Sequence, residues 1–510
     1  MGIKKYTAIK DNTITNAYGV DLSTRATGSN MGASDILEVF SIYGNKTTSS
    51  VELSRALVEF PISSITSDRN AGTIPASGSV KFYLRVFNAR HSEQLPENFT
   101  VNVLAVSRSW QEGSGLDMET YEDKTKNRVE GSNWVNRLKA TRWNKTGGDY
   151  HSSSYVSGST MPLYTYNFEK GYEDIELDVT EAVEEWAYGH KENYGFGIFL
   201  TSSQEGYFSN SAGIAQDSGS VLHNTEGTTK SFYTKRFFSK STEFFFKKPV
   251  IEARWDSRTT DDRGNFFASA SIAPPDDNLN NLYLYNYIRG RLVNIPASSE
   301  TITVSLYSSS ADIPTGSLLD SATASRVSTG VYKASIASEA TGSNGKLLSV
   351  IHDVWSGSAG GEYKTGSIVI KSFKDDSVLV SDTYTQYANK ITNLKSSYAK
   401  DEQARFRVFA RPRNFSPTIY SVASKDIEKT IILSASYEIL RMVDERTVIN
   451  NSTGSTTYHT YLSYDNDGNY FDLDMSLLEP GYMYGIKLAF HSSGKWREQE
   501  EVFKFRVEDN

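Results

Sequence analysis

Apolar and polar residues alternate with a period of two along much of the chain. In residues 80–87 the apolar face carries Val80, Phe82, Leu84 and Val86. Similar rows recur downstream, at residues 302–306, 406–410, 484–490 and 503–507. Because successive side chains of a strand point to opposite faces, each row predicts a strand with one buried face. Turn-forming segments separate the rows, which indicates β-sandwiches and not βαβ units.

One segment has helical periodicity instead. Its apolar residues recur at spacings of three and four, at Val179, Ala182, Val183 and Trp186. Asp178 and Glu181 fit a capping box at its start, and Gly189 fits a stop at its end. A helix this short is marginal in water, so its apolar stripe must pack on a sheet. We therefore expect a helix at 178–189 that closes one end of a sandwich.

The length of 510 residues exceeds what a single hydrophobic core holds and predicts about three domains. Composition shifts at two polar segments, residues 256–265 and residues 381–392. We expect an all-β protein with three serial β-sandwiches. The first, 1–255, is jelly-roll-like and carries the short helix; 256–385 and 386–510 are two smaller Ig-like sandwiches.

Composition excludes several classes of site and partner. The chain has no cysteine, so disulfides, thiol nucleophiles and thiolate metal sites are impossible, and folding in a reducing cytoplasm is favoured. No apolar run follows the lysines of the N-terminus, which predicts no signal peptide, and no run is long enough to span a membrane. The net charge of −8 argues against binding to nucleic acid.

The first half carries several landmarks in a fixed order. They are residues 8–14, 54–60, 109–113, 133–134, 143, 147–149, 178–180 and 193–196. On these landmarks the first domain resembles the DNRLRE-type β-sandwich, a jelly-roll-like module related to carbohydrate-binding modules and found in cell-surface and wall-associated proteins. Two features depart from that family: Lys10 opens a motif that usually begins with an acidic residue, and the family's common secretory signal is absent.

A second resemblance concerns the whole chain. It rests on residues 25–37, 246–255, 281–290 and 330–332. In these segments the chain is similar to structural proteins of tailed marine phages, and residues 478–487 resemble a turn and strand of an Ig-like module. The resemblance implies a virion protein that folds in the host cytoplasm and needs no signal peptide. It also implies that the partners are other virion proteins and further copies of the chain.

Four aromatic residues are candidates for glycan binding, because an exposed aromatic face complements the apolar face of a pyranose ring. They are Trp134, Trp143, Tyr150 and Tyr155. The simpler alternative is that the tryptophans of this region pack the sandwich and its covering loop. Trp134 and Trp143 lie among Asn, Arg and Gly in a long insertion, so they are the better candidates for a surface role.

Other polar clusters match no catalytic or metal-binding template. The carboxylates after Trp110 are Glu112, Asp117, Glu119, Glu122 and Asp123, which we interpret as solvated charge, with a calcium site as the alternative and glycoside hydrolysis as the weakest. In residues 465–474 the glycine comes too early for a calcium loop, and Asn466 to Gly468 predict a hairpin turn.

The sequence also lacks the motifs of zinc, nucleophile and phosphate-binding sites. The seven histidines, at 91, 151, 190, 223, 352, 459 and 491, never pair at zinc-ligand spacing. No nucleophile elbow or phosphate-binding loop stands between a strand and a helix. Residues 235–240 mix basic and aromatic residues as single-strand nucleic-acid binders do. In an acidic all-β chain we interpret them instead as a strand whose lysines face water. We therefore expect no metal, no cofactor and no enzyme activity.

Three hypotheses follow from the sequence. The first is a phage structural protein, in the neck, tail or head exterior, that assembles through its sandwiches and contributes to contact with the host surface. The second is a glycan-binding adhesion module. The third is a polysaccharide hydrolase, which is the weakest because every catalytic template fails.

Overall fold

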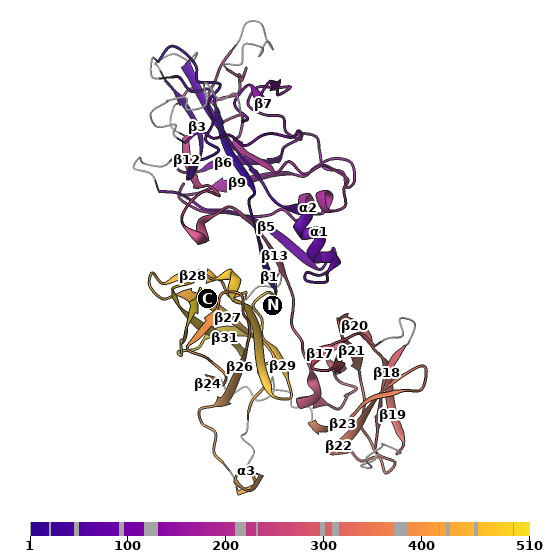
Figure 1. The fold of residues 1–510 in the computed structure, drawn as a ribbon. Coiled ribbons are helices and arrows are strands. Elements are labelled where there is room, and N and C mark those ends of the chain that lie inside the picture. Colours follow the sequence, from indigo (N-terminus) through magenta and orange to yellow (C-terminus); the bar gives the residue numbers. More distant parts are fainter. Residues whose placement is uncertain are drawn as a thin grey trace. The chain divides into compact units, whose positions relative to one another are not determined.

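The computed structural model of the protein describes most of the chain. The described residues are 2–19, 22–44, 50–90, 96–116, 131–209, 221–230, 233–295, 301–308, 316–371, 386–417, 419–424, 429–452, 457–492 and 494–509. The chain divides into two compact units, residues 3–255 and residues 256–510. Both units are built from β-sandwiches whose strands are mostly antiparallel, which confirms the all-β class (Figure 1).

The first unit is a sandwich of a four-stranded and a seven-stranded sheet. The four-stranded sheet has the order β1 (Ile3–Thr7), β13 (Val250–Trp255), β5 (Val80–Val86), β10 (Ile175–Asp178). The larger sheet has the order β12 (Tyr233–Phe238), β3 (Ile36–Tyr43), β4 (Val51–Glu59), β11 (Phe196–Leu200), β6 (Phe99–Ala105), β9 (Leu163–Phe168), and β2 (Lys10–Thr15) also pairs with β4. A small hairpin, β7 (Asn136–Leu138) and β8 (Thr141–Arg142), lies in the insertion after β6.

The core of this unit lies between the two sheets. The predicted inward row of β5 is confirmed, since Val80, Phe82, Leu84 and Val86 are all buried. They pack with apolar residues from the larger sheet, such as Val101 and Phe196. Burying a side chain of this size contributes roughly 1.5–3 kcal/mol, so the alternation along each strand is enough to define the core.

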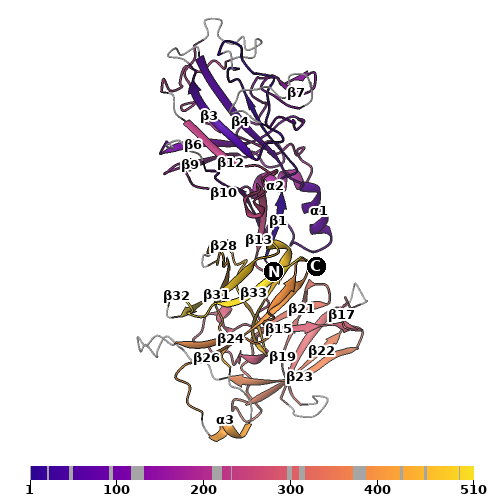
Figure 2. The same ribbon diagram turned by 60° about the vertical axis from the view of Figure 1, so that its left-hand side comes forward.

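Two helices pack against each other in the first unit (Figures 1 and 2). The predicted helix is confirmed as α2 (Thr180–Ala187), and its apolar stripe, including Trp186, is buried in the core. The capping box is wrong: Val179 occupies the N-cap, and the Asp178 carboxylate accepts a hydrogen bond from the backbone of Thr180 instead. Gly189 follows the helix with a φ of 76°, as expected for a helix stop.

The second helix of the first unit was not predicted. α1 (Ile62–Asn70) buries only Ile62 and Ile65, and its sequence has no continuous apolar stripe. The Arg69 guanidinium forms an ion pair with the Glu184 carboxylate of α2, at 2.7 Å. The helix α1 therefore depends on its contact with α2, because its own sequence gives little indication of a helix.

The orientation of Lys235 on strand β12 (Tyr233–Phe238) differs from the sequence prediction. β12 is a strand, as predicted, but Lys235 is 0% exposed and does not face water. Its ammonium group donates to three oxygen acceptors, which are the Asn88 side chain and the backbone carbonyls of Gly171 and Glu173. Burial is possible because these acceptors replace the hydrogen bonds to water.

Residues 256–371 form a smaller sandwich. Its five-stranded sheet has the order β14 (Phe266–Phe267), β23 (Glu362–Lys371), β22 (Val350–Gly357), β18 (Ile302–Tyr307), β19 (Leu318–Thr323). The opposite sheet has the order β15 (Asn280–Tyr285), β21 (Val331–Ile336), β20 (Ser325–Ser328), and β16 (Tyr287–Ile288) pairs with β17 (Arg291–Leu292). The short 3-10 turns are η3 (Asp262–Gly264) and η4 (Pro275–Asn278). The predicted row at 302–306 is buried.

The last sandwich begins at β24 (Tyr387–Ile391), which pairs in a sheet with β26 (Gln403–Pro412), β30 (Gly468–Asp474) and β29 (Ser463–Asp465). The second sheet contains β25 (Ser397–Ala399), β33 (Phe503–Glu508), β31 (Met483–Ser492), β27 (Ala435–Arg441), β28 (Arg446–Ile449) and β32 (Lys495–Glu498). α3 (Ile419–Ser424) and η5 (Met475–Leu477) complete the elements. The predicted turn at Asn466 is confirmed, because Asp465 pairs with Gly468 across the β29–β30 hairpin. In the described part of the chain, no helix is long and apolar enough to cross a membrane.

Candidate functional site

The outer face of the seven-stranded sheet carries a second apolar cluster, separate from the sandwich core. Its buried members are Ile14, Val51, Leu53, Leu57, Val106, Trp110, Trp134 and Trp143. Four of them lie on β2 and β4, and Val106 and the three tryptophans belong to the chain that follows β6. The insertion therefore folds back over this face of its own sheet, and the cluster is where sequence analysis places a glycan site.

The structure corrects the expected surface role of the tryptophans. Trp134 is 0% exposed and Trp143 is 4% exposed, so neither offers an open ring face to a ligand. The Trp143 indole donates to the Asn133 carbonyl at 2.9 Å, and the Trp110 indole donates to the Tyr194 carbonyl at 2.8 Å. The polar residues around these rings bond the backbone of the loop itself. For example, the Asn133 side chain accepts from the amides of Val135 and Asn136.

Tyr150 belongs to the same cluster. Its ring packs on Phe199, with centroids 4.6 Å apart, and covers Gly197 of β11. Its hydroxyl donates to the Gly147 carbonyl at 2.9 Å. Burial raises the pKa of Tyr150 to about 12, and the nearby Arg55 charge opposes this increase. Tyr150 is a packing residue of the covered face.

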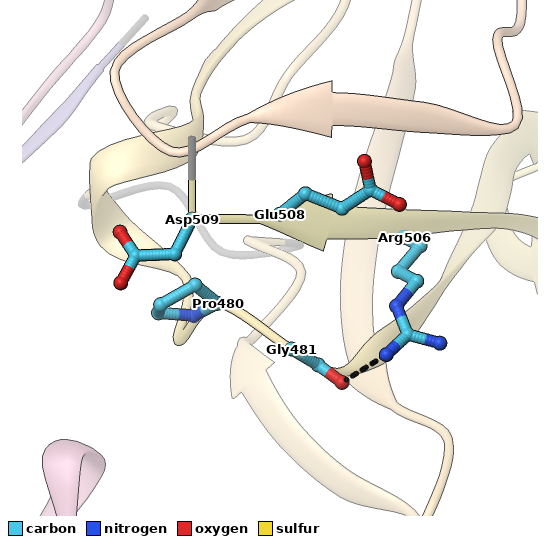
Figure 3. Close-up of a pocket in the computed structure, with 5 residues that line it drawn as sticks. All are labelled: Pro480, Gly481, Arg506, Glu508 and Asp509. Carbon is cyan, nitrogen blue, oxygen red and sulfur yellow. Dashed lines mark hydrogen bonds between the residues drawn. The ribbon is translucent and has the colours of Figure 1, made fainter.

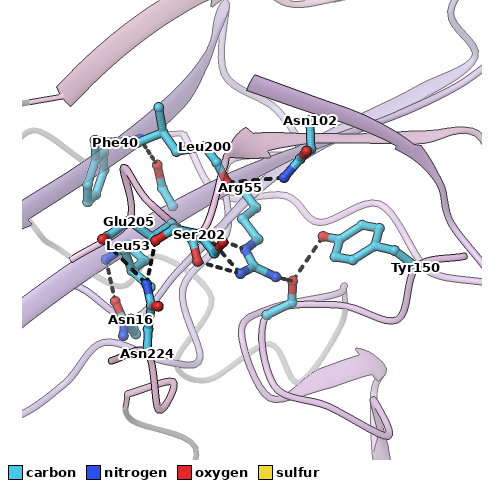
Figure 4. A network of polar contacts seen from close by, with 12 residues as sticks. Asn16, Phe40, Leu53, Arg55, Asn102, Tyr150, Leu200, Ser202, Glu205 and Asn224 are labelled. Carbon is cyan, nitrogen blue, oxygen red and sulfur yellow. Dashed lines mark hydrogen bonds and ion pairs between the residues drawn. The ribbon is translucent and has the colours of Figure 1, made fainter. Parts of the chain in front are cut away.

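A buried ion pair connects the sheet to the loops above it (Figure 4). Arg55 of β4 donates to the Glu205 carboxylate through Nε and Nη2, at distances of 2.9–3.2 Å, and through Nη1 to the Gly147 carbonyl at 3.1 Å. Its guanidinium lies 4.4 Å from the Phe199 ring centroid and 5.6 Å from that of Trp134. Because each of its charged donors has an acceptor or an aromatic face, the arginine is stable in this buried position.

Desolvation disfavours the charged forms of both residues of this pair, and each partner's charge favours them. Desolvation alone would lower the pKa of Arg55, but the Glu205 charge raises it. Desolvation raises the pKa of Glu205, and Arg55 counteracts that increase. Each charge therefore stabilises the charged form of the other. The pair also holds residues 147 and 205 against β4 through its hydrogen bonds. Sequence reasoning missed this pair, because its members are separated by 150 positions and belong to no motif.

Tyr155 lies in a different cluster. Its hydroxyl and that of Ser157 donate to the buried Glu185 carboxylate of α2, at 3.1 and 3.2 Å. The Gly158 amide and the His190 ring also contact this carboxylate. Although burial opposes ionisation, these hydrogen bonds lower the pKa of Glu185. Ser157 bonds to the carboxylate and not to the histidine, so the cluster anchors a loop and does not form a serine–histidine–acid relay.

The other acidic candidates give no metal site. Glu112 accepts from the Asp11 amide and forms an ion pair with Lys240. Asp117, Glu119, Glu122 and Asp123 lie outside the described residues. Asp465 is held by Arg407, at 2.7 Å, in the β29–β30 hairpin. Within the described ranges no group of three or more acidic or histidine side chains is placed to hold a metal ion.

Two surface hollows occur in the second unit. One, of about 430 Å³, is lined by Pro480, Gly481, Arg506, Glu508 and Asp509, and Arg506 donates there to the Gly481 carbonyl at 3.1 Å (Figure 3). The other, of about 450 Å³, lies beside β19 and residues 337–343. Its polar lining includes Ser269, Ser317, Asp320, Glu339 and Thr341. Neither lining contains a histidine.

A surface feature of the last sandwich was also missed by sequence reasoning. We call it the aromatic strip, and it consists of Tyr458, Tyr461, Trp496 and His491. Successive ring centroids are 5.0, 5.2 and 5.4 Å apart. His491 is exposed and the other three side chains are half-buried. At one end the Arg258 guanidinium lies 4.7 Å from the Tyr458 centroid and 4.9 Å from that of Tyr461.

Comparison with known proteins yields no family. No protein-family model matches the chain, and no curated protein matches it. Solved structures with which it aligns include elastase-activated α2-macroglobulin from Escherichia coli (11% identity, TM-score 0.15, 46% of this chain and 19% of that chain) and the four N-terminal Ig domains of Dscam1 (8%, 0.13, 45% and 41%). A third is the FN1–FN3 segment of chicken CNTN1 (10%, 0.15, 55% and 81%).

The chain spans less than half the length of the first two of these structures. The sheet topology defines an all-β protein with several sandwiches. At TM-scores of 0.13–0.15 these likenesses carry no further conclusion about this chain.

Proposed function

We propose that the protein is a structural component of a tailed-phage particle and that it contacts neighbouring subunits through surfaces of its sandwiches. The observation that carries the proposal is the aromatic strip. Tyr, Trp and Arg are the residue types enriched at the energetic centres of protein interfaces. The similarity of residues 25–37, 246–255 and 281–290 to phage structural proteins gives the biological setting.

The strip is suited to binding because its side chains are already ordered. Each ring packs on the next, and Arg258 is fixed from its other side by the Asp256 carboxylate, at 2.7 Å. Ordering a long side chain on binding costs about 0.5–1.5 kcal/mol, and that cost is reduced when the side chain is held before the partner arrives. A neighbouring subunit can therefore gain affinity from a modest contact area.

Purified virions provide the test. Mass spectrometry of the particle should detect the chain, and electron microscopy should locate it in the neck, tail or head exterior. The double variant Y461A/W496A should lower incorporation into particles at least tenfold, whereas Y287A, which removes an exposed tyrosine of β16, should not. Absence of the chain from purified particles would contradict the proposal.

Self-association is part of the same proposal. The purified chain should sediment as a homo-oligomer at micromolar concentration, and Y461A/W496A should shift it towards the monomer if the strip is the contact. A chain that remains monomeric and binds no other particle component would count against an assembly role.

The polar hollow beside β19 favours glycan binding as the second candidate. Its lining places hydroxyl groups of Ser269, Ser317 and Thr341 near the carboxylates of Asp320 and Glu339. Hydroxyl-rich ligands are bound by such donors and acceptors. On a glycan array, D320N/E339Q should lose any binding that the wild type shows, whereas W143F should retain it. Digestion of a polysaccharide by the wild type would instead favour the hydrolase hypothesis.

A further inference from the structure

Lys235 is a long charged residue of the first unit with 0% of it exposed. Its Nζ lies 4.5 Å from the Phe168 ring centroid and 5.3 Å from that of Phe237. Both rings belong to the sandwich core. The amine is therefore enclosed by apolar groups on one side and by a few polar atoms on the other.

The closest side-chain partner of this amine is Asn88. Nζ of Lys235 lies 2.7 Å from Oδ1 of Asn88. Asn88 follows β5, in the four-stranded sheet, while Lys235 lies on β12, in the seven-stranded sheet. Asn88 bridges Phe237 through its backbone, and its amide donates to the Asp174 carboxylate at 2.7 Å. These backbone contacts hold Asn88 beside Lys235, whose amine contacts the carboxamide.

A carboxylate completes the cluster. Glu173 accepts from the Lys170 amide through Oε1, but its Oε2 is buried and has no hydrogen-bond partner in the described structure. The backbone carbonyl of Glu173 accepts from Lys235 at 2.9 Å. An unpaired buried carboxylate oxygen is costly for stability. The Glu173 charge also acts on the Lys235 amine, because it raises the pKa of that amine.

We propose that Lys235 and Asn88 form an intramolecular isopeptide bond, with the Glu173 carboxylate as the proton carrier. The amine and the carboxamide are in contact, and Glu173, which supplies the carboxylate, accepts from the same amine through its backbone carbonyl. The product is a covalent link between the two sheets of the first sandwich.

The reaction balances without an oxidant or a co-reactant. The neutral Lys235 amine attacks Cγ of Asn88, a C–N bond forms, and the negative charge of the tetrahedral intermediate resides on Oδ1. Glu173 takes a proton from Nζ and delivers it to Nδ2. The Cγ–Nδ2 bond then breaks, and ammonia leaves. An amine and a primary amide are thus converted to a secondary amide and ammonia, and the carboxylate is regenerated.

The surroundings of Lys235 favour the unprotonated, nucleophilic form of its amine. Burial lowers the pKa of Lys235 to about 8, and the charges of Glu173 and Asp174 limit the decrease. A substantial fraction of the amine is then unprotonated slightly above neutral pH, in contrast to an ordinary lysine. Holding the two groups in contact also replaces a bimolecular reaction by a unimolecular one.

Intact-mass spectrometry of the folded protein tests the proposal. The wild type should be lighter than its sequence by one ammonia molecule, and protease digestion should release a branched peptide that contains both Asn88 and Lys235. N88A and K235M should have the full mass, and their folding is checked by circular dichroism. N88D should lose one water molecule in place of ammonia if it still forms the link.

The pair Lys371 and Asn265 is the matched control, because Nζ and Oδ1 are 3.2 Å apart there but exposed to solvent. Their peptides should remain separate. E173Q should slow formation of the link at least tenfold, and an unchanged rate would overturn the assignment of Glu173 as the proton carrier. A folded wild type that keeps the full sequence mass after incubation at about pH 9 would overturn the isopeptide bond.

Discussion

The ring of Tyr150 lies flat against the backbone of Gly197, and a Cβ at that position would overlap the ring. Gly197 is the second residue of β11, and its missing side chain makes room for Tyr150 of the insertion that covers the sheet.

We predict that G197A destabilises the first unit by roughly 1–3 kcal/mol, because the added methyl group displaces Tyr150 from its packed position. Urea denaturation, followed by tyrosine and tryptophan fluorescence, measures the loss. The matched control is G361A, because a Cβ at Gly361 meets no atom within 4 Å. Equal stability of G197A and the wild type would show that the insertion is not held by this contact.

Trp134 should behave as a core residue. W134A should lower the free energy of unfolding of the first unit by about 3–5 kcal/mol, because a fully buried indole leaves a cavity. The half-buried Trp496 of the aromatic strip offers a comparison, and W496A should cost much less. If W134A left stability unchanged but abolished binding to a glycan, the surface role expected from the sequence would be restored.

The Arg55 and Glu205 charges should be strongly coupled. R55M should cost about 3–5 kcal/mol, since it leaves a buried carboxylate without its partner. The double variant R55M/E205Q should recover part of this loss, and the double-mutant cycle gives the coupling free energy. R413M, which removes a surface ion pair with Glu500, should leave stability unchanged. Additive effects of R55M and E205Q would contradict the coupling.

Glu252 should make the first unit sensitive to acid. Although burial alone would raise its pKa, the charges of Lys5, Arg85 and Arg254 lower the pKa of Glu252 to about 2. The pKa of an unfolded glutamate is about 4.3, so the folded state binds fewer protons between these values. The stability contributed by Glu252 is therefore complete above about pH 5 and is lost as the pH falls towards 2.

Unfolding free energies measured against pH check this effect. The difference between the wild type and E252Q should be largest above about pH 5 and should shrink on acidification. E243Q, which removes an exposed glutamate of the same unit, is the control variant. A difference that grows on acidification would have the wrong sign for a lowered pKa.

The strands and α2 could be predicted because their signals are local. Val80 to Val86 and Val179 to Trp186 carry complete periodic patterns, and burial follows directly from those patterns. α1 has no such pattern. It depends on contact with α2, about 115 residues away in sequence, as the Arg69 and Glu184 pair shows.

The exposure predicted for Trp134 and Trp143 was wrong for a related reason. Trp134 and Trp143 have polar neighbours, which usually indicates a surface loop, but those neighbours satisfy the loop's own backbone and leave the rings free to turn inward. Lys235 was assigned to the surface by its charge. Its acceptors come from residues 88, 171 and 173, and no local pattern brings them together.

The pairing of β1 with β13 has a mechanical consequence. Ile3 lies opposite Arg254, so the chain enters and leaves the first sandwich through neighbouring antiparallel strands. Tension between these two points would peel the strands apart one hydrogen bond at a time and would not shear the sandwich as a whole. Both strands carry core residues, such as Tyr6 and Ile251, so peeling would open the core from this edge. Because the chain enters and leaves at neighbouring positions, the sandwich would behave as a side branch that can be inserted into another chain at a single point.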